Sequence, residues 1–267
     1  MQRFDSLGRK KVVIGLVHLP PLPGTPFYRE GSLAQILEGA VADALALYRG
    51  GADGCLVQTV DRVYAAVDDA DAARVAAVAV ITRAIVEATG PEFAVGVQIM
   101  LNALKASLAV AKVCGGAFLR CTALVGATLT AAGLVQANPL DVLTYRACLG
   151  AEEIKLIAEV HSVHFRWLGG ERSVAEVARM AVRAGADAVE VAHPDEATNA
   201  RLVREVKEAL PQVPVLLGGY TTHENVARRL AEADGVFVGT CLKAGPGEAR
   251  VDVDRVRAYV DLVSRLQ

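Results

Sequence analysis

Residues 154–161, which read IKLIAEVH, alternate apolar and polar side chains, as expected for a β-strand whose two faces differ. One face is apolar and can pack on helices. The opposite face carries Lys155, Ile157, Glu159 and His161. Burying three ionisable groups on one strand face is costly unless they pair or take part in chemistry. This strand therefore predicts helices on one side and an enclosed polar site on the other.

Seven further runs rich in β-branched residues predict strands, and helix-length amphipathic stretches separate them. They are Lys11–Val17, Asp53–Thr59, Phe93–Ile99, Ala117–Cys121, Asp187–Ala192, Val213–Leu217 and Asp234–Val238. Alternating strands and helices favour βαβ units with a parallel sheet. Eight such units in 267 residues match the size of a (β/α)8 barrel. We expect an α/β fold, a single TIM barrel forming one domain over residues 1–267.

Three short phrases repeat where a helix ends and a strand begins. They read Gly51-Ala-Asp53-Gly54, Gly185-Ala-Asp187-Ala188 and Ala233-Asp234-Gly235. The repetition supports successive βα units, and no linker or low-complexity segment interrupts them.

Hydrophobic content, net charge and cysteine spacing indicate which classes of protein the chain can belong to. The chain is 53% hydrophobic with a mean hydropathy of +0.34, so it can bury a large core. A net charge of −2 offers no electrostatic footprint for nucleic acid. No apolar run is long enough to span a membrane, and no signal peptide follows Met1. The five cysteines are scattered without a CxxC pair, so we expect reduced, buried thiols and a soluble cytoplasmic protein.

Polar residues gather at the carboxyl ends of the predicted strands, the end at which barrel enzymes place their sites. We assign catalytic roles to Glu159 with His161 or His18 as an acid–base pair, and to Arg120 as a partner of negative charge. We assign ligand-binding roles to Gln58, Gln98, Lys155, Glu190 and His164. The alternative is a buried polar network whose groups bond only with one another and bind no ligand, with Lys155 paired to Glu159 or Glu190.

Two imidazoles and a carboxylate, from His18, Glu159 and His161, could also ligate zinc or iron. No HxH motif ends the first strand and no Asp ends the eighth, so we predict no metal site and no cofactor. A divalent metal, as in a metal-dependent hydrolase, remains the minor alternative.

Glycines follow the last two predicted strands. The seventh ends in Gly218-Gly219 and the eighth in Gly239-Thr240. Glycines let backbone N–H groups approach an anion closely, and barrels often hold phosphate at these two strand ends. We therefore predict that Gly218, Gly219, Gly239 and Thr240 bind a small anionic ligand. The long loops at Leu19–Phe27 and Thr122–Asn138 are expected to cover the same mouth.

Several motifs resemble the BtpA/SgcQ-like family over roughly residues 11–260. They are Val13-Ile-Gly-Leu-Val-His18-Leu-Pro-Pro-Leu-Pro-Gly24, Phe118-Leu-Arg120, Gly126-Ala127, Tyr145-Arg146, Leu149-Gly150 and Val238-Gly-Thr240-Cys-Leu-Lys243. The resemblance implies a barrel related to phosphate-binding barrels. One branch of the family is associated with photosystem I accumulation, and another with sugar-metabolism gene clusters.

The sequence departs from the resembled family pattern at Gln58, Leu101, Ala103, Ala131, Ala132 and Val163. At all of these except Ala132, where glutamine is usual, a neutral residue replaces an ionisable one. Two functions follow as hypotheses. The first is an enzyme acting on a sugar phosphate or a nucleotide-like molecule by lyase, isomerase or glycosidic-bond-cleaving chemistry. The second is a non-catalytic assembly factor for a membrane complex such as photosystem I, with peripheral membrane association. A homo-oligomer is compatible with both.

Overall fold

In the computed structural model, which describes residues 4–245 and 249–266, eight parallel strands close into a barrel in the order β1-β10-β9-β8-β7-β4-β3-β2. The predicted (β/α)8 TIM barrel is confirmed, and each predicted strand is present with ends shifted by no more than about two residues. The strands are β1 (Val12–Leu19), β2 (Gly54–Thr59), β3 (Ala94–Gln98), β4 (Phe118–Cys121), β7 (Lys155–His161), β8 (Ala188–Val191), β9 (Val215–Gly218) and β10 (Gly235–Val238).

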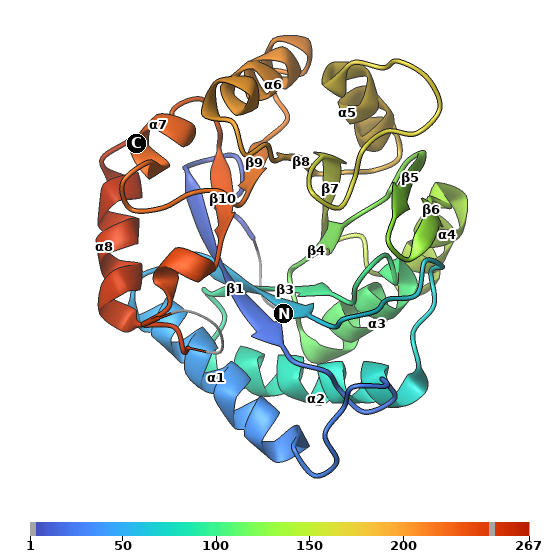
Figure 1. The fold of residues 1–267 in the computed structure, drawn as a ribbon, viewed down its shortest axis with the longest axis vertical. Coiled ribbons are helices and arrows are strands. Elements are labelled where there is room, and N and C mark those ends of the chain that lie inside the picture. Colours follow the sequence, from blue (N-terminus) through green and yellow to red (C-terminus); the bar gives the residue numbers. More distant parts are fainter. Residues whose placement is uncertain (1–3, 246–248, 267) are drawn as a thin grey trace.

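Helices surround the strands as an outer ring (Figure 1). They are α1 (Leu33–Arg49), α2 (Ala72–Thr89), α3 (Leu104–Cys114), α4 (Pro139–Cys148), α5 (Val174–Arg183), α6 (Glu196–Ala209), α7 (Val226–Arg229) and α8 (Val253–Ser264), with a 3-10 turn, η1, at Thr240–Leu242. Within the described ranges, no helix is both long and apolar enough to cross a membrane.

The alternation along the strands divides the core into two layers. Outward-facing residues such as Leu156, Ala158 and Val160 pack against the helices. Inward-facing Ile157 belongs to a separate cluster that fills the barrel. Phe4 joins this inner cluster, with its ring centroid 5.1 Å from that of Phe118. The N-terminal segment thus closes the barrel at the amino ends of the strands.

The three repeated phrases fix the same end of the barrel. Asp53, Asp187 and Asp234 each accept a hydrogen bond from a backbone N–H of the preceding strand, at 2.7–2.9 Å. Each aspartate also pairs with a lysine, namely Lys10, Lys155 and Lys207. The repeated aspartate therefore hydrogen-bonds the start of each of these three strands to the strand before it.

Lys155 corrects one expectation. It begins β7 at the amino end of the strand, where its side chain is 39% exposed and pairs with Asp187 at 2.9 Å. Neither Glu159 nor Glu190 is its partner, because the first residue of a barrel strand lies at the rim and can reach solvent. Lys155 therefore lies at the end of the barrel opposite the predicted site.

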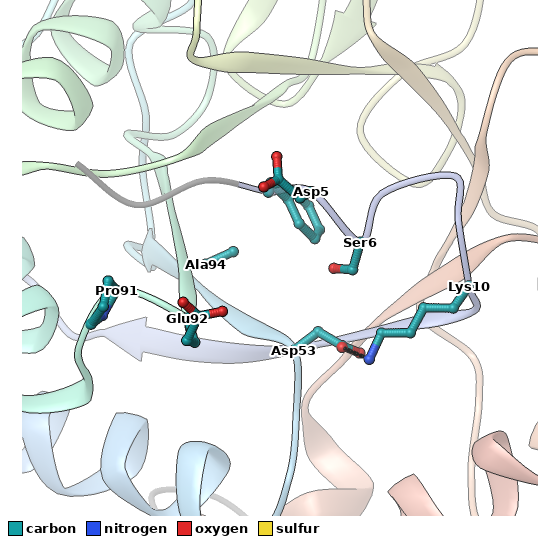
Figure 2. A pocket seen from close by; sticks show the side chains of 8 residues that line it. Asp5, Ser6, Lys10, Asp53, Pro91, Glu92 and Ala94 are labelled. Carbon is teal, nitrogen blue, oxygen red and sulfur yellow. Dashed lines mark ion pairs between the residues drawn. The ribbon is translucent and has the colours of Figure 1, made fainter.

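A pocket of about 310 Å³ lies at this amino-terminal end (Figure 2). Asp5, Ser6 and Glu92 line it, beside the ion pair between Lys10 and Asp53. Because barrel enzymes place their chemistry at the carboxyl ends of the strands, we do not take this pocket as the candidate site.

The long β4–α4 connection and the burial of two cysteines differ from what the sequence predicted. The connection folds as an antiparallel hairpin of β5 (Ala127–Thr130) and β6 (Gly133–Gln136), which the sequence analysis did not predict. All five cysteines are free, but Cys148 is exposed and Cys241 is half-buried, so only three are the buried thiols we expected.

Candidate active site

The polar residues of the sequence analysis meet near the carboxyl ends of the strands because the strand register aligns them. His18 lies opposite Gln58 on the neighbouring strand, and Gln58 lies opposite Gln98. On the other side of the barrel, Glu159 lies opposite Glu190. This ring sits above the apolar filling of the barrel, so the site is polar at the mouth and closed below.

Arg120 joins the two carboxylates. Its guanidinium donates to both oxygens of Glu190 at 2.6 Å and lies 3.5 Å from Glu159 Oε1. All three side chains are at most 4% exposed. Arg120 is therefore committed to carboxylates of its own chain, the arrangement that the alternative interpretation predicted, rather than open to a ligand.

Glu159 accepts hydrogen bonds from three other side chains. The donors are Gln98 Nε2 at 3.4 Å, Thr122 Oγ1 at 3.3 Å and the hydroxyl of Ser162. Gln98 in turn accepts from Gln58 at 2.9 Å. The amides thus link Glu159 to β2 across the barrel.

One guanidinium serves two buried carboxylates, so the cluster carries one negative charge too many. Burial raises the pKa of Glu190 to about 7; Arg120 opposes this shift and the charge of Glu159 adds to it. Near neutral pH, Glu190 can therefore bind and release a proton deep in the barrel.

His18 lies at the end of β1 and is neutral at pH 7. Burial and the nearby charge of Lys243 lower its pKa to about 4, against a hydrogen bond with Gln58 that raises it. Its imidazole can accept a proton.

His161 was expected to pair with Glu159, and the structure shows a different environment. The register of β7 against β8 shifts between these two residues, so His161 lies opposite Val191, whose side chain belongs to the outer core. Its ring contacts the Arg166 guanidinium and lies 5.9 Å from the ring of His193. Burial and Arg166 together lower the pKa of His161 to about 4.

His164 lies close enough to Glu159 to sense its charge. Burial lowers the pKa of His164; the charge of Glu159 opposes this shift and that of Arg120 adds to it. Ser162 connects the two residues, since its hydroxyl donates to Glu159 and accepts the backbone N–H of His164. His164 was predicted to bind ligand, and the structure places it near the charges of Glu159 and Arg120.

The glycine-rich strand ends lie beside this cluster. A Cβ on Gly218 would lie 1.9 Å from Glu190 Oε1, so Gly218 makes room for the carboxylate. Gly219 adopts a φ of +104°, which only glycine takes readily. Among described residues, the N–H groups of Gly219, Gly239 and Thr240 donate no hydrogen bond. These N–H groups are available to an anion, although α7 and η1 are too short to add a substantial dipole.

Two cations at the mouth escaped the sequence analysis. Lys243 lies near His18, and Arg166 lies near both His161 and Tyr220. In the described part of the chain, neither forms an ion pair with a carboxylate. Both residues lie in irregular loops that follow strands, where no periodicity predicts which way a side chain points. Lys243 was noted only as the last residue of a family motif. The two cations give the mouth positive charge that no described carboxylate pairs with.

The set proposed as the minor metal alternative is not assembled. His161 turns towards Arg166 and His193, away from Glu159. Over residues 4–245 and 249–266, no group of three or more His, Cys, Asp or Glu side chains is placed to hold a metal ion.

Comparison with known proteins identifies relatives along nearly the whole chain. A model of the BtpA family matches residues 9–265. An uncharacterized protein of Archaeoglobus fulgidus is 31% identical, covering 94% of this chain and 98% of its own. The photosystem I biogenesis protein BtpA of Synechocystis is 28% identical, covering 99% and 92%. A tryptophan synthase chain from M. tuberculosis superposes with a TM-score of 0.60 at 19% identity, covering 96% and 93%, which shows a shared fold.

Proposed function

This chain belongs to the BtpA family, and from that premise and the geometry of its barrel mouth we propose that it is an enzyme acting on a small phosphorylated molecule by acid–base catalysis. The ligand class is a sugar phosphate or a nucleotide-like compound. Its phosphate would lie at the ends of β9 and β10, and its reacting part over His18 and His164.

The proposal rests on one observation: free backbone N–H groups and cationic side chains without a described acidic partner lie at the same mouth. Gly219, Gly239 and Thr240 offer N–H groups that no described residue accepts. Lys243 and Arg166 stand at the same mouth without an acidic partner among the described residues. Charge-assisted hydrogen bonds to such groups are the strong contacts by which proteins hold phosphate. Two cations at one mouth with no acidic partner among the described residues favour an anionic ligand.

Two histidines near the proposed phosphate end support proton transfer. His18 is neutral at physiological pH and can accept a proton from a bound ligand. Burial lowers the pKa of His164, and the nearby Glu159 carboxylate opposes that shift, so a neutral His164 can take up a proton beside a negative charge. Glu159 is 1% exposed and acts through His164, so it is a positioning residue. Lyase, isomerase and glycosidic-bond-cleaving reactions all use such a pair.

A thermal-shift screen tests the ligand class. The probes are inorganic phosphate, ribose 5-phosphate, adenosine monophosphate and their unphosphorylated counterparts, each with and without magnesium. A ligand present at 100 times its Kd raises the unfolding free energy by about 2.7 kcal/mol, which is readily detected. We expect a phosphorylated compound to stabilise the protein and its unphosphorylated counterpart to have no effect. Equal shifts for both would remove phosphate from the proposal.

A second candidate function rests on the Synechocystis relative, whose name assigns it to photosystem I biogenesis. The β5–β6 hairpin supports it, because Leu129 and Leu134 are 70% and 49% exposed on facing strands. In this view the barrel is a peripheral assembly factor that docks on a membrane complex. Co-sedimentation with liposomes tests it: binding that Leu129→Ser abolishes supports docking, and absence of sedimentation counts against it.

A further inference from the structure

Tyr220 is a bulky residue in a backbone conformation that side chains seldom adopt. It follows Gly219 just beyond β9 and has a φ of +58°, and among the described residues no other non-glycine has a positive φ. Glycine takes this conformation freely, whereas a bulky residue is strained in it and keeps it only where the surroundings impose it. Such residues gather at functional sites, so the side chain of Tyr220 is a candidate for a role of its own.

A hydrogen-bonded network holds the turn that carries Tyr220. Asn225 Nδ2 donates to the carbonyl of Tyr220 at 3.1 Å, and Asn225 Oδ1 accepts the N–H of Thr222 at 2.7 Å. Thr221, between them, is 7% exposed, and its Oγ1 accepts the hydroxyl of the fully buried Tyr259 at 2.7 Å. The backbone at Tyr220 is therefore fixed by contacts in which its own ring takes no part.

The ring of Tyr220 is left without a task in the fold. Its side chain is 42% exposed. Over residues 4–245 and 249–266, its hydroxyl has no hydrogen-bond partner and its ring makes no aromatic or cation–π contact. An exposed ring that the fold does not use, held in a strained conformation at the barrel mouth, favours contact with a ligand.

Other planar side chains stand on the same side of the mouth. Arg166 lies near Tyr220 and contacts the ring of His161, which is 5.9 Å from the ring of His193. Arg166, His193 and Tyr220 come from the loops after β7, β8 and β9, which are consecutive strands of the barrel. Aromatic rings and arginine planes are the surfaces on which proteins stack nucleobases.

We infer that the phosphorylated ligand is a nucleotide, and that Tyr220 determines this specificity by stacking on its base. The inference rests on the proposed function, because the phosphate would bind to the free N–H groups of Gly219, Gly239 and Thr240. Gly219 adjoins Tyr220 in the chain, so the phosphate end and the ring belong to one site. A sugar phosphate has no planar group and would leave the ring exposed.

Titration calorimetry with adenosine monophosphate and ribose 5-phosphate tests the inference. The proteins are the unmodified chain, Tyr220→Ala, Tyr220→Phe and Tyr48→Ala. Tyr48 is the matched control, because it is 45% exposed and lies against Phe93 at the opposite, amino-terminal end of the barrel. Alanine at position 220 needs the same positive φ as tyrosine, so this variant removes the ring and leaves the demand on the backbone unchanged.

We expect adenosine monophosphate to bind the unmodified protein about tenfold more tightly than ribose 5-phosphate, because only the nucleotide has a base to stack. Tyr220→Ala should weaken the nucleotide about tenfold and leave ribose 5-phosphate within about twofold. Tyr220→Phe keeps the stacking face and should bind both compounds as the unmodified protein does. Tyr48→Ala should also change neither affinity.

Three results overturn the inference and leave the proposed phosphate site standing. They are equal binding of the two compounds by the unmodified protein, equal weakening of both by Tyr220→Ala, and a loss in Tyr220→Phe as large as that in Tyr220→Ala. Binding of neither compound by the unmodified protein overturns the proposed function, and the inference with it.

Discussion

Arg120 and Glu190 face each other inside the barrel through two hydrogen bonds of 2.6 Å, and the carboxylate of Glu159 lies 3.5 Å from the same guanidinium. Three strands, β4, β7 and β8, contribute one residue each. The cluster therefore ties neighbouring strands together as well as setting the charge of the site.

Removing the cation should destabilise the fold severely. Arg120→Met leaves two buried carboxylates without a counter-ion, and breaking a buried pair in this way costs about 3–5 kcal/mol. Arg204→Met breaks a surface pair with Glu232 whose members are 53% and 45% exposed, and should cost at most about 1 kcal/mol. Urea unfolding of both variants measures the difference; equal losses would contradict the role given to Arg120.

Glu190 should make stability depend on pH. Its pKa is raised to about 7 in the folded protein from its usual 4.5, so the native state holds a proton that the unfolded chain has lost. That contribution is complete below pH 4.5 and disappears as the pH rises through 7. Glu190→Gln cannot titrate, so over this range the unmodified protein should lose unfolding free energy relative to the variant. Parallel curves for the two proteins would rule the shift out.

His18 should act in the opposite direction. Its pKa is lowered to about 4 from 6.5, so between these values the unfolded chain binds a proton that the native state does not. Its contribution is complete above pH 6.5 and is lost as the pH falls towards 4. Against His18→Gln, the unmodified protein should therefore become relatively less stable on acidification, which chemical denaturation at pH 4.5 and 7 would detect. A constant difference at the two pH values would contradict the environment assigned to His18.

The space beside Glu190 can be tested at Gly218. A methyl group there would stand 1.9 Å from Glu190 Oε1, so Gly218→Ala should displace the carboxylate and destabilise the protein by about 1–3 kcal/mol, the usual cost of overpacking. Gly245→Ala is the control, because its nearest neighbour beyond the adjoining residues is 3.8 Å away. Thermal unfolding compares them, and an unaffected Gly218→Ala variant would show that the glycine is not required there.

The sequence predicted the fold because each strand carries its own periodicity. Ile157 inside and Leu156 outside follow from alternation alone. The same rule placed Glu159 and Glu190 in the site. It failed for His161, because the register shift in β7 is a tertiary feature that alternation cannot reveal. It also failed for Lys155, because alternation gives a face and does not say how near the rim a residue lies.

The residues that could not be predicted lie where no sequence pattern shows which way their side chains point. Arg166 stands in a loop, and its place beside His161 and Tyr220 follows from the folding of that loop. Arg74 occurs among alanines and valines in a helix, where a cation ordinarily indicates a solvated face. Only the surrounding loops show that it is buried.

Titration calorimetry of ribose 5-phosphate with the unmodified protein, Lys243→Gln and Lys10→Gln tests the central claim most directly. The two substitutions remove the same charge at opposite ends of the barrel, Lys243 at the mouth and Lys10 beside the amino-terminal pocket. We expect one saturable site, weakened about tenfold by Lys243→Gln, or about 1.4 kcal/mol, and unchanged by Lys10→Gln. No binding by the unmodified protein, or equal weakening by both variants, would contradict a phosphate site at the carboxyl end of the barrel.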